Sequence, residues 1–178
     1  VSVTLMRADD LSVVASSVAA VDVEGSWQVS LDGQPASYSK YIIRIEDGQD
    51  LIEIQDVLFG EVWMVSGQSN MNLALKYISN HDEIESTINT AGNEYIRGLN
   101  STNAIVVGAT ACSQTPLDDM PGAHWGSATN FDGVADLSGV GVTFALKLFD
   151  YLNQNGNKVP IAILSETRGA TNIRAWLI

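Results

Sequence analysis

The sequence has few of the residues on which several classes of protein depend. Its single cysteine, Cys112, excludes an intrachain disulfide, and we expect it to be a buried apolar side chain rather than a reactive thiol. No apolar run approaches the roughly 20 residues of a membrane-spanning helix. Only 9 Lys and Arg oppose 21 Asp and Glu, which gives a net charge of −12. This charge argues against nucleic acid or an anionic membrane as a partner, because phosphate binding needs a basic surface.

Histidine is scarce as well, since His81 and His124 are the only two. His81 lies in a polar stretch, and His124 lies beside Trp125 in a stretch without regular pattern. We expect both to be surface or structural residues rather than catalytic bases. No group of His, Cys and carboxylates has the spacing of metal ligands, so the sequence implies no metal and no other cofactor.

The first third of the chain has the pattern of short antiparallel strands. Alternating apolar and polar residues predict strands at 1–5, 12–18, 27–31, 41–45 and 51–54. Gly, Asp and Pro separate them, as in the turns that reverse a chain between antiparallel strands. Residues 1–56 are therefore predicted to form a small β-sandwich-like domain.

From residue 57 onward the pattern changes to alternating strands and helices. Strands are predicted at 62–65, 95–99, 104–108 and 159–165, and helices from 71 to about 78, at 83–88 and at 138–155, with Ser138 as the N-cap of the last. Residues 110–133 are expected to be an irregular functional loop. Residues 57–178 are therefore predicted to be an α/β domain with a parallel sheet covered by helices.

One serine lies where a predicted strand ends and a helix begins. Ser69 follows the apolar run 62–65 and precedes the helical pattern. Such a junction exposes a side chain beside the free N–H groups of the next helix, which stabilise an oxyanion. This is the geometry of a nucleophilic serine. The alternative is that Ser69 only caps the helix, because serine favours that position in general.

The residues around Ser69 also carry a family resemblance. Residues 59–63 (FGEVW) and 66–71 (SGQSNM) resemble the first conserved block of the sialate O-acetylesterase-type members of the SGNH (GDSL-like) hydrolase superfamily. The elbow of α/β-hydrolases fits less well, because Met71 stands where that motif ends in glycine. The resemblance implies an SGNH-like parallel sheet, with Ser69 as the nucleophile and Gln68 and Asn70 as residues that shape its turn.

A second stretch, residues 165–176 (SETRGATNIRAW), resembles the family's later block, in which a strand leads through a Gly-Gly-Thr turn into a helix. The resemblance implies that Gly169 adds its N–H to that of Ser69 in the oxyanion hole and that Thr171 shapes the site. Arg168 replaces a usual aromatic residue, and Ala170 replaces the second glycine, which leaves substrate preference open. The alternative is that Gly169 is only a turn glycine.

The resemblance as a whole implies a serine esterase that removes O-acetyl groups from a carbohydrate, either sialic acid or an acetylated polysaccharide. It favours a secreted or periplasmic location, which the sequence itself does not show. The family's Asp-x-x-His segment, which supplies the base, has no counterpart here, so we expect the N-terminal part of such an enzyme, inactive alone and self-associating through uncovered sheet surface. The rival interpretation is a non-catalytic carbohydrate-binding or interaction protein, in which tryptophans stack on sugars.

Overall fold

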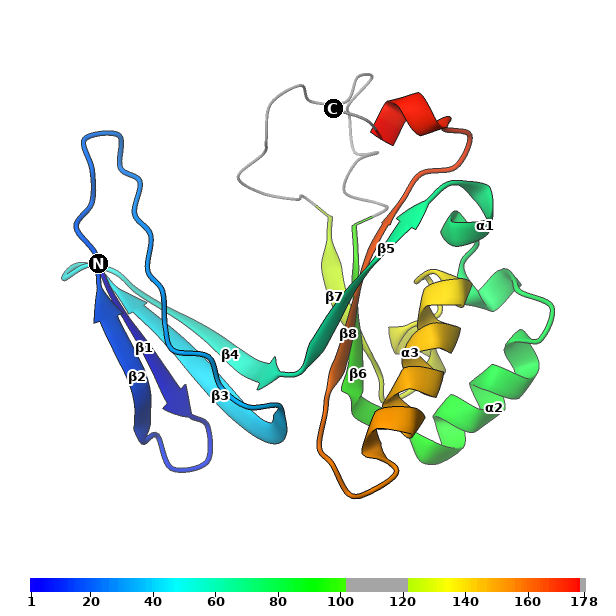
Figure 1. The fold of residues 1–178 in the computed structure, drawn as a ribbon, viewed down its shortest axis with the longest axis horizontal. Helices are drawn as coiled ribbons and strands as arrows, with labels where there is room; N and C mark the ends of the chain where they lie inside the picture. Colours follow the sequence, from blue (N-terminus) through cyan, green and yellow to red (C-terminus); the bar gives the residue numbers. More distant parts are fainter. Residues whose placement is uncertain (102–121, 177–178) are drawn as a thin grey trace. The chain divides into compact units, whose positions relative to one another are not determined.

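The computed structural model describes residues 1–101 and 122–176. The predicted strand at 104–108 and Cys112 lie outside these ranges. The chain divides into two compact units, Val1–Gly60 and Glu61–Ile178, each with its own sheet (Figure 1). The change from antiparallel strands to a sheet with helices therefore follows Gly60.

The first unit is one antiparallel sheet with strand order β2-β1-β3-β4. Its strands are β1 (Ser2–Arg7), β2 (Val13–Val18), β3 (Ser37–Glu46) and β4 (Leu51–Phe59). One face buries Val3, Leu5 and Tyr41, and the ring of Tyr41 meets that of Phe59 edge-on at 5.0 Å between centroids. Four of the predicted strands are thus present, and they form a single layer within residues 1–60.

The strand predicted at residues 27–31 is absent, which corrects the sequence interpretation. These residues lie in the connection between β2 and β3 that contains no strand, and Trp27 is 41% exposed. A period-two pattern specifies a strand only where one face of it is buried. Nearly all residues from 20 to 30 face solvent, so the alternating apolar residues have no buried face to occupy.

The second unit contains four strands, three α-helices and three 3₁₀ helices among its described residues. They are β5 (Glu61–Gly67), α1 (Ser69–Asn72), η1 (Leu75–Tyr77), α2 (His81–Ala91), β6 (Asn93–Asn100), β7 (His124–Ala128), η2 (Phe131–Gly133), α3 (Gly139–Asn153), β8 (Ile161–Thr167) and η3 (Ile173–Trp176). No helix among them is long and apolar enough to cross a membrane.

The sheet of the second unit has the order β5-β8-β6-β7. Both β5 and β6 run parallel to β8, and β7 is antiparallel to β6. The predicted α/β class with a parallel sheet is confirmed. The predicted irregular loop at 110–133 is wrong for its described part, because residues 124–128 pair with β6 and residues 131–133 form η2.

Helix α3 holds the core against one face of this sheet. Its N-cap is Ser138, as predicted, whose Oγ accepts the N–H of Gly141 at 3.2 Å. Val142 and Ala145 of α3 are buried together with Ile161 and Ile163 of β8. Figure 1 shows α2 and α3 on the same side of the sheet. Helix α2, which extends the helix predicted at 83–88 at both ends, buries Ile84 and Ile88 in the same core.

The opposite face carries an apolar row across all four strands. Met64 pairs in register with Leu164, Leu164 with Leu99, and Leu99 with Trp125. Met64 is 66% exposed and Trp125 is 57% exposed, and Val62 on the same face is 62% exposed. We call Val62, Met64, Leu99, Trp125 and Leu164 the open face. Among the described residues of this unit, no helix covers it.

The position of β8 decides between two forms of the expected uncovered sheet surface, an unpaired edge of the strand at 159–164 or an uncovered face. The edge is excluded, because β8 lies between β5 and β6 and is hydrogen-bonded on both sides. Strand order depends on contacts between distant parts of the chain, which residue patterns do not encode. The apolar surface that remains is a face, and exposed faces of this kind favour association.

We expect the open face to mediate self-association, which the substitution Met64→Lys should weaken. Apolar burial contributes roughly 25 cal/mol per Å², and a charge within the contact should weaken association at least tenfold, or about 1.4 kcal/mol. Light scattering across a concentration series measures the effect. Val23→Lys is the control, since Val23 is fully exposed in the first unit. A monodisperse monomer at high concentration would contradict the expectation.

Candidate active site

The two predicted oxyanion-hole residues follow neighbouring parallel strands. Gly67 of β5 pairs in register with Thr167 of β8, and Ser69 and Gly169 each lie two residues further along. The backbone N–H of Arg168 donates to the carbonyl oxygen of Gly67 at 2.9 Å, which extends the pairing past the last register pair. The structure therefore brings Ser69 and Gly169 to the carboxyl edge of the same strand pair.

The turn from β5 into α1 requires glycine at position 67. Gly67 has a φ of +141°, in a region that other residues rarely adopt. A Cβ added there would lie 2.8 Å from Cγ of Met71. The backbone therefore folds back against the side chain of Met71, and this sharp reversal exposes Ser69 at the start of α1.

Ser69 is held by the side chain that precedes it. The Oε1 atom of Gln68 accepts both the hydroxyl of Ser69 and its backbone N–H, the latter at 2.8 Å. Gln68 is the N-cap of α1, and its carbonyl oxygen accepts the N–H groups of Met71 and Asn72 at 2.8 and 3.0 Å. Gln68 therefore holds both the hydroxyl oxygen and the backbone N–H of Ser69 in place.

Helix α1 is a single turn, which corrects the predicted helix from 71 to about 78. Leu73 is extended, and Ala74 makes an isolated bridge with Ser138. The N–H of Gly139 donates to the carbonyl oxygen of Leu73 at 2.8 Å, and the N–H of Leu75 donates to Leu137 at 2.8 Å. These contacts with the start of α3 replace the local helical hydrogen bonds and hold the turn that carries Ser69 against the core.

Two further contacts hold η1 against the segment that precedes α3. Lys76 Nζ lies 2.6 Å from Asp136 Oδ1, and this hydrogen bond and charge raise the pKa of Lys76. Both side chains are largely exposed, so the pair adds little stability by itself. The backbone N–H of Lys76 also donates a hydrogen bond to the carbonyl oxygen of Ala135 at 3.1 Å, which joins the same two segments.

Asn72 connects the two halves of the site and was missed by sequence reasoning. The hydroxyl of Thr167 donates to Oδ1 of Asn72 at 2.9 Å. The Nδ2 atom of Asn72 lies 3.6 Å from the point where Gly169 would carry a Cβ. Residues three apart on a helix share a face, so the position of Asn72 relative to Ser69 was the available signal.

The turn after β8 presents Gly169. Gly169 is half-buried, and among the described residues its N–H has no hydrogen-bond partner. The hydroxyl of Thr171 donates to the carbonyl oxygen of Arg168 at 2.8 Å, which closes the turn. Ala170 has a φ of +60°, a left-handed conformation that glycine adopts without strain.

The remaining candidate residues lie apart from a catalytic arrangement. Asn70 is exposed on α1. His81 Nδ1 lies 2.9 Å from the carbonyl oxygen of Ile78, and its Nε2 lies 3.0 Å from Oδ1 of Asp82. His124 begins β7, with Nδ1 3.4 Å from the carbonyl oxygen of Gly122. These are local contacts, so neither histidine is placed as a base for Ser69.

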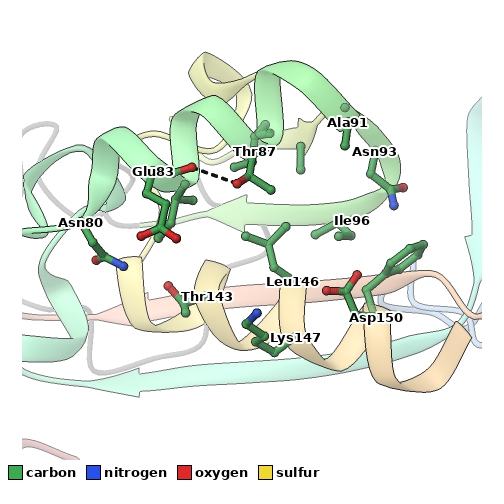
Figure 2. A pocket seen from close by; sticks show the side chains of 15 residues that line it. Asn80, Glu83, Thr87, Ala91, Asn93, Ile96, Thr143, Leu146, Lys147 and Asp150 are labelled. Atoms are coloured by element: carbon green, nitrogen blue, oxygen red, sulfur yellow. Dashed lines mark hydrogen bonds between the residues drawn. The ribbon is translucent and has the colours of Figure 1, made fainter. Parts of the chain in front are cut away.

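A cavity of about 240 Å³ lies between α2 and α3, at the other end of the sheet. Figure 2 shows side chains of the two helices facing one another across it, and the hydroxyl of Thr87 donates to the carbonyl oxygen of Glu83. Asn93, the first residue of β6, also lines it. Asn93 lies at the amino end of β6, whereas Ser69 follows the carboxyl end of β5, which runs in the same direction as β6. The cavity and the candidate active site therefore lie at opposite ends of the sheet.

Comparison with known proteins identifies what the chain is similar to. It is 31% identical to a sialate O-acetylesterase from Pongo abelii over 131 residues, which are 70% of this chain and 22% of that protein. It is 28% identical to a sialate O-acetylesterase from Rattus norvegicus over 160 residues, which are 85% of this chain and 27% of that protein. The matched part spans about a quarter of the length of each of these relatives. The resemblance predicted from residues 59–71 is confirmed.

A solved structure supports the fold. A carbohydrate acetylesterase from Xanthomonas citri superposes with a TM-score of 0.72 at 24% sequence identity, covering 98% of this chain and 35% of that one. No protein-family profile matches the chain. The likeness shows that this chain and the bacterial protein share a fold.

We expect Gly67→Ala to destabilise the second unit by about 1–3 kcal/mol. The new Cβ combines a strained backbone with a contact of 2.8 Å to Met71, so the turn from β5 into α1 must shift. Denaturant unfolding measures the loss. Gly33→Ala is the matched control, because nothing lies within 4 Å of its Cβ position and its φ is not positive, and it should change stability little. Equal behaviour of the two variants would contradict the account of this turn.

We expect the opposite sign for Ala170→Gly. Relief of a left-handed conformation is worth roughly 1–2 kcal/mol, and the added chain entropy of glycine removes about 0.5–1 kcal/mol of this, so a net gain of about 0.5–1 kcal/mol should remain. The thermal unfolding midpoint measures it. Ala91→Gly, at an exposed position in the last turn of α2, should instead lower stability. A loss of stability in both variants would show that Ala170 is not strained.

Proposed function

We propose that this chain carries the nucleophile and part of the oxyanion hole of a serine esterase that removes O-acetyl groups from a carbohydrate. The observation that supports the proposal most is that Ser69 and Gly169 lie just beyond the backbone hydrogen bond from the N–H of Arg168 to the carbonyl oxygen of Gly67, one on each of the two connected segments. The similarity to sialate O-acetylesterases supports the reaction class. The substrate is then an acetylated carbohydrate.

The chemistry follows from these two positions. The Oγ atom of Ser69 attacks the acetyl carbonyl carbon and loses its proton to a base, and the carbonyl oxygen becomes an oxyanion. The N–H groups of Ser69 and Gly169 donate to that oxyanion. Collapse expels the sugar oxygen, which takes a proton, and leaves an acetyl ester on Ser69. Water then attacks this ester and releases acetate.

Gln68 must move for this reaction to proceed. Its Oε1 atom accepts the N–H of Ser69 and the hydroxyl of Ser69, so it occupies the donor that the oxyanion needs. A substrate carbonyl oxygen that enters the site takes its place. Gln68 and Asn70 thereby shape the turn, and neither reacts.

The base is the component that the described residues do not supply. His81 is held by Ile78 and Asp82, and His124 lies beside Gly122 on the opposite edge strand of the sheet. Without a base the Ser69 hydroxyl stays neutral. Removal of triad members leaves a residual acceleration of about 10³–10⁴ over water, which the oxyanion hole and binding provide. The 178-residue chain should therefore acylate slowly and turn over hardly at all.

A carbohydrate-binding role without catalysis is the competing function, and one observation favours it. Trp125 is 57% exposed on the open face, where an indole ring is available to stack on a sugar. This role needs no reactivity at Ser69. The two functions therefore differ in whether Ser69 reacts.

We expect 4-nitrophenyl acetate to acetylate Ser69 selectively and to release little product beyond one equivalent. The oxyanion donors accelerate attack by Ser69, while deacylation lacks a base. Peptide mapping by mass spectrometry should find acetyl groups on Ser69 well above the level on the exposed Ser16. Ser69→Ala removes the signal, and Ser16→Ala leaves it. Equal labelling of both serines would refute the nucleophile assignment, and rapid turnover abolished by Ser69→Ala would point to an unexpected base.

A further inference from the structure

The cavity between α2 and α3 has an apolar floor that the proposed function does not use. It is lined by Ile84 and Ile88 of α2, Ile96 of β6 and Leu146 of α3, and the three isoleucines are buried. Its volume is about 240 Å³, whereas a cavity of about 150 Å³ holds one benzene ring. The space is therefore large enough for a ring with a short substituent.

Contacts with other elements hold the two helices in place around this cavity. Near the end of α2, the Oδ1 atom of Asn89 accepts the backbone N–H of Phe131 at 2.9 Å. At the end of α3, Asn153 Nδ2 donates to the carbonyl oxygen of Val159 at 3.1 Å, and its Oδ1 accepts the N–H of Val159 at 2.8 Å. Because each helix is anchored in this way, α2 and α3 cannot approach one another without breaking these hydrogen bonds.

The polar groups at the rim of the cavity are mainly charged. The hydroxyl protons of the two lining threonines are already used, since Thr87 donates to the carbonyl oxygen of Glu83 at 2.9 Å and Thr143 donates to a carbonyl oxygen of its own helix at 2.7 Å. The side chains of Glu83, Lys147 and Asp150 also line the cavity and are exposed. Two carboxylates and one ammonium group give this rim a negative charge.

The two carboxylates lie on different helices and face the same space. Figure 2 shows Glu83 on α2 and Asp150 on α3 directed toward the gap between the helices, with Leu146 beside the apolar floor. Asp150 follows Leu146 by four residues, so the two side chains share one face of α3. A positive group at Asp150 would therefore have the apolar floor beside it. The net charge of −12 adds to the attraction of a cation.

We propose that the cavity between α2 and α3 binds a small apolar amine. The apolar part of the ligand packs on Ile96 and Leu146, and its ammonium group donates to the carboxylate of Asp150. Apolar burial supplies most of the affinity, and the charge-assisted hydrogen bond selects a cation over a neutral molecule of the same shape. The site goes beyond the proposed function, because binding there requires no reaction at Ser69.

The test is an NMR titration of the 178-residue chain with isotopically labelled isoleucine methyl groups. The probes are 2-phenylethylamine, 2-phenylethanol and phenylacetate, which share a ring and are cationic, neutral and anionic at neutral pH. The methyl resonances of Ile84, Ile88 and Ile96 report binding. We expect the amine to bind about fivefold more tightly than the alcohol, which is the upper range for an exposed ion pair. Added salt should reduce this preference.

The substitution Ala91→Phe tests whether the ligand occupies the cavity. Ala91 is exposed in the last turn of α2 and lines the cavity, so a phenylalanine side chain should fill the space and abolish binding without lowering the unfolding midpoint. Thr90→Phe is the matched control, because Thr90 is the exposed neighbour that does not line the cavity, and it should bind the amine normally. Binding that survives Ala91→Phe would overturn the site, since general attraction of an amine to an acidic chain needs no cavity.

A second set of variants tests the charge preference. Asp150→Asn should bring the ratio of amine to alcohol affinity to about one, and Asp132→Asn, an exposed residue of η2 that does not line the cavity, should leave it unchanged. A ratio that survives Asp150→Asn and disappears in Glu83→Gln would overturn the assignment to Asp150. Equal affinities for amine and alcohol, tighter binding of phenylacetate, or no methyl shift with any probe would overturn the proposal, and selective acetylation of Ser69 would be unaffected by each of these results.

Discussion

The parallel pairing of β5 with β8 is the constraint on which the site depends. Seven register pairs, from Glu61 with Ile161 to Gly67 with Thr167, bring the two strands to the same edge in step. A slip of one residue would turn every side chain of one strand to the wrong face, so the buried residues Val65 and Ile163 hold this register. The distance between Ser69 on one loop and Gly169 on the other is therefore set by the core rather than by either loop.

The turn that carries Ser69, residues 67–72, has little structure of its own and is ordered by tertiary contacts. Helix α1 has four residues, too few to be stable alone. It is fixed by the contact of Gly67 with Met71, by the bond between Asn72 and Thr167, and by the backbone bonds of residues 73–76 to residues 135–139. Because α3 packs on β8, the helix that builds the core also positions the segment that follows Ser69.

This dependence explains which features the sequence could predict. Local patterns identified α3 with its Ser138 cap, the strands β5, β6 and β8, and the junction at Ser69, because each is encoded by neighbouring residues. The helix after residue 71 was predicted too long, since Leu73 and Ala74 exchange helical bonds for contacts with Ser138 and Gly139. The role of Asn72 and the central place of β8 depend on partners far along the chain, which a single sequence does not reveal. The family resemblance supplied Gly169, whose own residue pattern indicated only a turn.

The two N–H groups proposed as oxyanion donors differ in their hydrogen bonding, and this difference bears on how such a site would favour a transition state. The N–H of Gly169 has no partner among the described residues, whereas the N–H of Ser69 donates to Oε1 of Gln68 at 2.8 Å. If the neutral carbonyl oxygen of a bound ester replaced Oε1 of Gln68, the N–H of Ser69 would exchange one neutral acceptor for another. The binding free energy gained at this N–H would be small. An oxyanion is a charged acceptor, and hydrogen bonds to charged acceptors are about twice as strong as neutral ones. Displacement of Gln68 therefore favours the oxyanion over the ground-state carbonyl, and interactions that strengthen only in the transition state are those that accelerate a reaction.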